Sequence, residues 1–121
     1  MARIKLKFYD KEYTIEYANR IEVKEYFAQL EKVYSKDELS KIENVNDEEF
    51  YEKGMKMLVI LLKAGLVEHH KNEMPSDKDL ERWATSIPNI KEFYQYLTKM
   101  LQDVIQVIEQ DTKNLKWEVE A

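Results

Sequence analysis

The residue types most able to do chemistry in this chain are the two histidines, His69 and His70, because the chain has no cysteine. A disulfide, a thiolate zinc site and a cysteine nucleophile are therefore excluded. Adjacent residues on a helix point about 100° apart, so the two imidazoles are badly placed to share one ligand. His69 and Glu73 are four residues apart and can bind a metal only if a helix continues to Glu73. We favour a position at a helix end, where histidine interacts favourably with the dipole and bonds the last carbonyls.

Motifs for catalysis are missing from the rest of the sequence. The two glycines, Gly54 and Gly65, stand too far apart to form a phosphate-binding loop. Neither a G-x-S-x-G elbow nor an HExxH motif occurs. Pairs of acids are uninformative in a chain with 24 carboxylates. The sequence predicts no catalytic residue, no metal site and no cofactor, and we expect that the protein is not an enzyme.

Charge and aromatic content favour a protein partner. A formal net charge of -5 argues against nucleic acid, since binding to phosphates needs a concentrated basic surface. The basic stripe of Arg3, Lys5 and Lys7 is better explained as a solvated face neutralised by a neighbouring strand. Eight tyrosines, two tryptophans and five methionines are residue types that protein interfaces favour.

Hydropathy predicts a soluble protein that stays in the compartment where it is made. The longest unbroken apolar run extends only from Met57 to Leu62, whereas a membrane span needs about 20 such residues. The first residues lack the apolar stretch of a secretory signal. We therefore expect no contact with a membrane.

Residues 3–17 alternate between apolar and polar types, which is typical of two half-buried strands. We predict an antiparallel hairpin with Asp10-Lys11 as its turn. This turn sets a register in which apolar residues face one another and cations face polar or acidic residues. The predicted pairs are Phe8 with Tyr13, Leu6 with Ile15, Ile4 with Tyr17, Lys5 with Glu16, and Lys7 with Thr14.

Apolar residues with helical spacing predict a first helix over residues 20–34, capped by Asn19 and lying on the hairpin. We predict a linker or a short helix for residues 35–46. Asn46 starts a second helix that is apolar nearly all round, so we expect it to be central and most buried. In that helix Gly65 either allows close approach of a neighbour or ends the helix.

Two further helices follow. Pro75-Ser76 introduces a short helix that ends before Pro88. The last helix, roughly residues 90–112, carries an apolar stripe wider than one core contact requires, so we expect it to serve both the core and a partner. The predicted partner-binding residues are Phe93, Leu97, Leu101, Val104, Ile108 and Trp117.

These patterns predict one α+β domain over residues 1–121, in which an N-terminal antiparallel β-hairpin (3–17) packs on a mainly helical bundle of four to five helices (20–112). Residues 113–121 are predicted to be an extended tail. Their alternation of apolar and charged residues suits a strand that adds to a sheet edge, in this chain or in another.

Two segments resemble the tail assembly chaperones of long-tailed bacteriophages, in particular those of Gram-positive hosts. The stretch from Ile4 to Tyr17 is similar to their N-terminal hairpin and is followed by an Asn-Arg step, Asn19-Arg20, into a helix. The stretch from Leu61 to His70 is similar to their leucine-rich segment, which ends in Ala-Gly-Leu and a histidine pair. The likeness covers most of residues 3–87, although the hairpin turn lacks the usual glycine.

This resemblance implies a function. Such a protein coats the tape measure protein, keeps it soluble and recruits tail tube subunits during tail morphogenesis. It works in the host bacterial cytoplasm and is absent from the mature virion. Two alternatives remain open: a neck or tail completion protein of the virion, and an unrelated bacterial protein-binding adaptor. A homo-oligomer is compatible with each of them.

Overall fold

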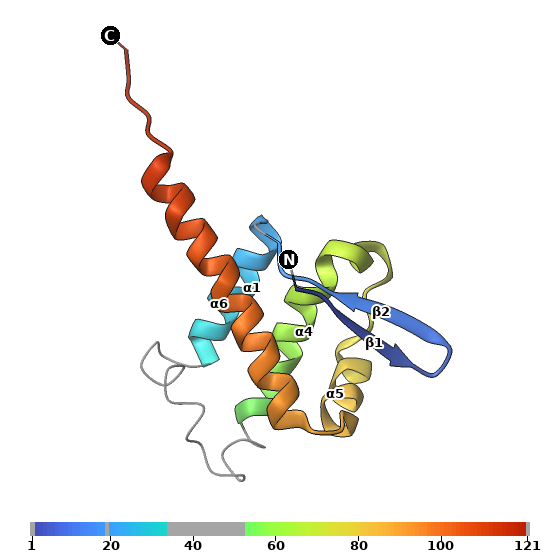
Figure 1. The fold of residues 1–121 in the computed structure, drawn as a ribbon. Helices are drawn as coiled ribbons and strands as arrows, with labels where there is room; N and C mark the ends of the chain where they lie inside the picture. Colours follow the sequence, from blue (N-terminus) through green and yellow to red (C-terminus); the bar gives the residue numbers. More distant parts are fainter. Residues whose placement is uncertain (1, 19, 34–52, 121) are drawn as a thin grey trace.

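The computed structural model describes residues 2–18, 20–33 and 53–120, and Figure 1 shows their arrangement. The predicted fold class is confirmed: the chain has an α+β fold in which an antiparallel hairpin precedes the helices. Its elements are β1 (Ile4–Phe8), β2 (Lys11–Ile15), α1 (Ile21–Val33), α4 (Met55–His70), the 3-10 helix η3 (Lys71–Glu73), α5 (Asp77–Ser86) and α6 (Ile90–Asn114).

The hairpin forms, but the predicted register is wrong by two residues. Ile4 pairs with Ile15, Leu6 with Tyr13, and Phe8 with Lys11. The turn is therefore Tyr9-Asp10, with Tyr9 in the left-handed region at φ 55°. A shift of two residues keeps every side chain on its predicted face.

The contacts between charged residues also differ from the predicted pairs. Arg3 contacts Glu16 at 2.8 Å and Lys5 contacts Glu12 at 3.4 Å. Tyr17 explains the shift, because its side chain does not pair with Ile4 across the sheet. It lies in the core instead, where its hydroxyl donates a hydrogen bond of 2.8 Å to the carbonyl oxygen of Leu61.

Helix α4 is central, as predicted, and contacts α1, β2 and α5 (Figure 1). Gly65 lies inside this helix and does not end it. A Cβ at Gly65 would overlap the Ile15 side chain, so the glycine allows β2 to approach the helix backbone. The buried residues of α4 are Met57, Leu58, Leu61, Leu62, Ala64, Gly65, Leu66 and Val67.

Helix α1 packs mainly against α4, and the prediction that it lies on the hairpin is wrong. It buries Val23 and Leu30. Two ion pairs join the start of this segment to the end of α4 and to η3: Arg20 binds Glu68 through two nitrogens, and Lys71 contacts Glu22 at 2.9 Å. The predicted cap Asn19, the linker 35–46 and the helix start at Asn46 lie outside the described residues.

Helix α5 begins where the sequence predicts, because the Ser76 hydroxyl accepts a hydrogen bond of 3.2 Å from the main-chain N–H of Asp79. The helix buries Leu80, Trp83 and Ala84. The indole of Trp83 lies against the rings of Phe8 and Tyr13, with centroid distances of 5.4 and 4.7 Å. This aromatic cluster joins α5 to the apolar face of the hairpin.

Helix α6 is the longest described element and ends at Asn114, two residues beyond the predicted end. Its buried residues all lie between Tyr94 and Val104. Beyond Val104 the helix projects from the body of the molecule, and the extended residues 115–120 continue in the same general direction (Figure 1). Only the first part of α6 therefore contributes buried side chains to the core.

Candidate partner-binding groove

The two histidines hold β2 against α4. His69 Nε2 lies 2.8 Å from Glu16 Oε2, and the main-chain N–H of Thr14 donates to His70 Nε2 at 2.9 Å. Both residues lie at the end of α4, where the sequence predicts a helix end. Their described side-chain hydrogen bonds go to Thr14 in β2 and to Glu16 just after it, which corrects the expectation that they bond the last helical carbonyls.

The electrostatics of this junction fit a structural role. The hydrogen bond from His69 is the largest cause that lowers the pKa of Glu16, and nearby Arg3 also lowers it. Burial lowers the pKa of His70, and the neighbouring His69 adds to this effect. A neutral His70 keeps the lone pair that Nε2 needs to accept the Thr14 N–H.

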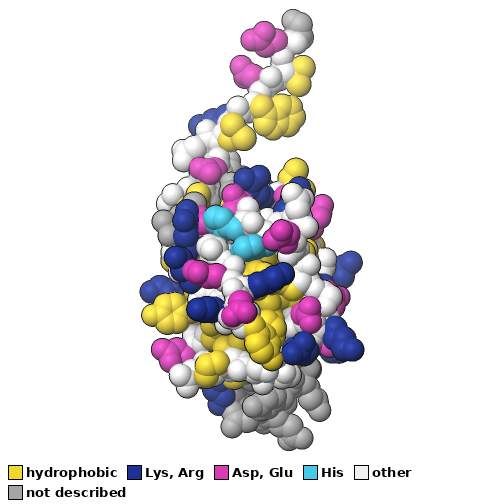
Figure 2. Space-filling view, turned by 90° about the vertical axis from the view of Figure 1, so that its right-hand side faces the viewer, with side chains coloured by type: hydrophobic (Ala, Val, Ile, Leu, Met, Phe, Trp, Pro, Cys, Tyr) yellow, Lys and Arg dark blue, Asp and Glu magenta, His cyan; other side chains and the backbone are white. Residues whose placement is uncertain are grey.

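Metal binding gains no support at the same junction. The α-helix ends at His70, so Glu73 lies in the following 3-10 helix and the helical spacing proposed for His69 and Glu73 does not form. Within the described parts of the chain, no three His, Asp or Glu side chains are grouped so that they could hold a metal ion. Figure 2 shows the histidines on a face where acidic and basic side chains surround them.

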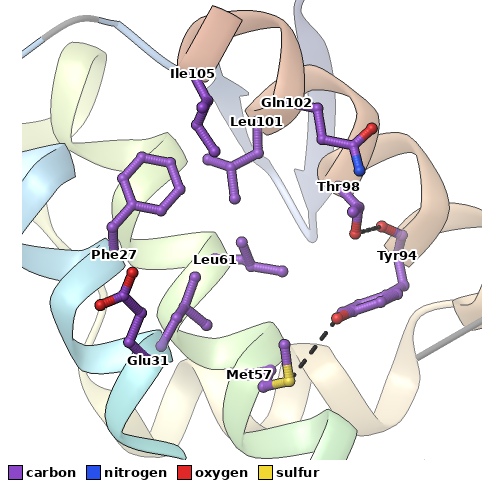
Figure 3. Close-up of a pocket in the computed structure, with 10 residues that line it drawn as sticks. Phe27, Glu31, Met57, Leu61, Tyr94, Thr98, Leu101, Gln102 and Ile105 are labelled. Carbon is purple, nitrogen blue, oxygen red and sulfur yellow. Dashed lines mark hydrogen bonds between the residues drawn. The ribbon is translucent and has the colours of Figure 1, made fainter. Parts of the chain in front are cut away.

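An apolar hollow of about 330 Å³ lies between α1, α4 and α6. Phe27 comes from α1, Met57 and Leu61 come from α4, and Leu101 and Ile105 come from α6. Figure 3 shows that Phe27 and Ile105 face each other across the opening. We call this hollow the α1–α6 groove; its other lining residues are Leu30, Glu31, Tyr94, Thr98 and Gln102.

Polar groups lie at the ends of the α1–α6 groove rather than along its floor. The Tyr94 hydroxyl points to Met57 Sδ at 3.8 Å, and the Thr98 hydroxyl donates to the Tyr94 carbonyl oxygen at 2.9 Å (Figure 3). Glu31 and Gln102 lie on opposite sides, on α1 and α6. A surface of this kind binds apolar side chains and orients them by its polar margin.

The predicted partner-binding residues do not form one exposed face. Leu97, Leu101 and Val104 are buried, with exposed fractions of 0%, 8% and 8%. Phe93 and Ile108 are half-buried against the same core, whereas Trp117 is 85% exposed on the tail. Of these six residues only Leu101 lines the α1–α6 groove. The wide stripe on α6 therefore serves mainly the core.

Sequence reasoning missed most of the lining residues, among them Phe27, Met57 and Ile105. Each belongs to an apolar pattern that the sequence does show, but the pattern alone assigns it to the core. Only the packing of α1 beside α6 leaves these side chains around an opening. Ile105 is 36% exposed. In the sequence, only its place at the edge of the apolar stripe on α6 indicates this exposure.

Among residues 2–18, 20–33 and 53–120, no helix combines the length and apolar character needed to cross a membrane. In comparisons with known proteins, no family model, no curated protein and no solved structure matches this chain.

Proposed function

We propose that this protein is a non-enzymatic assembly chaperone that binds an apolar helical client in the α1–α6 groove. The observation that carries the proposal is the groove itself, an apolar hollow of about 330 Å³ between the helices α1, α4 and α6. Grooves of this form bind amphipathic helices, whose apolar side chains enter the hollow while their polar face stays in water.

The sequence resemblance suggests which client this is. The hairpin sequence and the segment from Leu61 to His70 resemble phage tail assembly chaperones, so we propose the tape measure protein as the client and the tail tube protein as a second partner. The protein acts in the host bacterial cytoplasm and leaves before the virion matures. A net charge of -5 suits this role, because it keeps a complex with an apolar client in solution.

Co-expression with a tape measure protein of a long-tailed phage tests the proposal. Ile105→Glu places a carboxylate in the α1–α6 groove and should abolish co-purification of the client. Val107→Glu is the matched control, because Val107 is 50% exposed on the same helix and does not line the groove. This control variant should bind normally.

Both variants must remain folded, which circular dichroism checks. Leu101→Glu is unsuitable because Leu101 is buried and a charge there would disrupt the core. A folded Ile105→Glu chain that still solubilises the client would refute binding in the α1–α6 groove. Detection of the protein in purified phage particles would instead refute the chaperone role and favour a virion component.

A further inference from the structure

The two outer edges of the hairpin differ in how their backbone groups are satisfied. Along β2 and the residue that follows it, the outward N–H of Thr14 donates to His70 and the outward N–H of Glu16 donates to the carbonyl oxygen of Gly65, at 2.9 and 3.0 Å. Helix α4 therefore covers the hairpin edge at Thr14 and Glu16.

The β1 edge presents the backbone of Lys5 and Lys7. Ile4, Leu6 and Phe8 pair directly with β2, and residues between such pairs in an antiparallel ladder direct their N–H and C=O groups outward. No described residue bonds to these outward groups of Lys5 and Lys7. A free edge of this kind is a template for another strand.

An apolar hollow of about 380 Å³ adjoins this edge. The side chains of Leu6 and Phe8 line it from β1, Trp83 and Ile87 from α5 and its end, and Phe93 from α6. Lys5 and Lys7 also line it and are exposed. A strand added here thus meets an apolar surface on one face and positive charge on the other.

The extended tail, residues 115–120, has the complementary pattern. Leu115, Trp117 and Val119 are 79%, 85% and 82% exposed, so three large apolar side chains lie in water. They alternate with Lys116, Glu118 and Glu120. Because successive side chains of a strand point to opposite faces, the tail as a strand has one apolar and one mainly acidic face.

We propose that the tail of one copy adds to β1 of a second copy as a third, antiparallel strand. With Trp117 opposite Phe8, the indole enters the hollow beside β1. In this register Glu118 faces Lys7 and Glu120 faces Lys5, so both acids meet a cation. Lys116 then lies opposite Tyr9, beyond the end of β1, and meets no like charge.

The donor is another copy because the tail cannot reach the hollow of its own chain. From Phe93 to Leu115 the helix rises about 33 Å. Two extended residues, from Leu115 to Trp117, return only about 7 Å. Reciprocal exchange, in which each copy donates its tail and accepts the other's, closes a two-fold dimer. This exchange does not involve the α1–α6 groove and stands apart from the proposed function.

Light scattering on the purified chain measures the association directly. We expect a mass near twice the 14.6 kDa of one chain, falling at low concentration. Trp117→Ser removes the apolar side chain of the donated strand. Lys7→Pro removes an outward N–H of β1, and the hydrogen bonds between β1 and β2 do not use this group, so the hairpin should keep them. Each variant alone should be monomeric. Val107→Ser, an exposed apolar change outside the tail, should remain dimeric.

Mixing the two monomeric variants is the decisive measurement. The Lys7→Pro chain still has an intact tail and the Trp117→Ser chain still has an intact edge, so together they should form a one-way pair. In a mixture of Glu118→Lys/Glu120→Lys with Lys5→Glu/Lys7→Glu, the tail of each chain meets an edge of opposite charge on the other chain. This mixture should therefore form a reciprocal dimer, and the test keeps every backbone group.

Three results would overturn the proposal. The first is a wild-type chain that stays monomeric up to millimolar concentration. The second is a dimer that survives Trp117→Ser. The third is a chain that stays monomeric and needs its tail to bind the client, because the tail would then bind the client and not a second copy of the chain.

Discussion

The main-chain N–H of Glu16 donates a hydrogen bond to the carbonyl oxygen of Gly65, 3.0 Å away, and so joins the chain just after β2 to the middle of α4. The absence of a side chain at Gly65 makes this approach possible, because Ile15 occupies the position that a Cβ would need. The contact sets the position of the hairpin on the helical part of the fold.

Gly65→Ala should therefore destabilise the protein. Alanine normally stabilises a helix by about 1 kcal/mol relative to glycine. Here the added methyl overlaps Ile15, and overpacking typically costs about 1–3 kcal/mol. We expect a net loss in the free energy of unfolding, measured by urea denaturation. Lys56→Ala, an exposed change on the same helix, should have little effect, and a Gly65→Ala chain more stable than wild type would contradict the close approach.

Tyr17→Phe tests the buried hydrogen bond to the carbonyl oxygen of Leu61. Removing the hydroxyl should lower the free energy of unfolding by about 0.5–1.5 kcal/mol, since the ring still fills its site. Burial also raises the pKa of the Tyr17 phenol, so the hydroxyl stays a donor well into alkaline solution. Tyr96→Phe, on an exposed tyrosine, should be neutral in the same denaturation experiment; equal effects of the two changes would argue against the buried bond.

The hydrogen bond from Thr14 to His70 predicts a loss of stability in mild acid. Burial lowers the pKa of His70 below its ordinary value of 6.5, with a further contribution from His69, while Glu73 acts in the opposite direction. The unfolded chain thus binds a proton more readily than the folded chain. The contribution of His70 is complete above pH 6.5 and is lost as the pH falls through the folded-state pKa.

His70→Gln separates this contribution from those of other groups, because the glutamine amide oxygen can accept the Thr14 N–H and does not titrate. Urea denaturation across this pH range should show a flatter dependence for His70→Gln than for wild type. The contribution of Glu16 changes only at lower pH, because its pKa lies below 4.5: its stabilisation is complete above pH 4.5 and is lost as the pH falls through the folded-state pKa. Identical profiles for the two chains would show that His70 does not carry the effect.

Ser76→Ala removes the side-chain cap of α5. Loss of the bond to the Asp79 N–H should cost about 1 kcal/mol in the free energy of unfolding. Ser86→Ala at the other end of α5 serves as the control, because Ser86 is exposed and has no described hydrogen bond from its side chain. Thermal unfolding of both variants gives the comparison, and equal melting temperatures would mean that the cap adds nothing.

The hairpin shows how much of a structure a local sequence pattern can predict. Period-two alternation in residues 3–17 places each side chain on the right face, because alternation depends only on strand geometry. It leaves a shift of two residues undecided, since such a shift preserves both faces. The shift observed here depends on Tyr17, which leaves the sheet for a bond with Leu61 that is 44 residues away along the chain.

The sequence pattern predicted the candidate site less well than it predicted the fold. The stripe on α6 correctly marked an apolar helix, and Leu101 does line the α1–α6 groove. Periodicity cannot divide such a stripe between core and surface, however. Leu97 and Val104 became core residues because α6 packs beside α4 and α1, whereas Ile105 stayed at the opening.

Local information in the chain was sufficient for the α+β class, the helix start at Ser76, the buried central helix and the absence of cysteine chemistry. These features depend on hydrophobic period, capping residues and composition, which act over a few neighbouring positions. Tertiary contacts decided the hairpin register, the packing of α1 on α4, the hydrogen bonds of His69 and His70, and the opening beside Ile105. Each of these depends on residues far apart in sequence, and their relative positions arise only when the whole core packs.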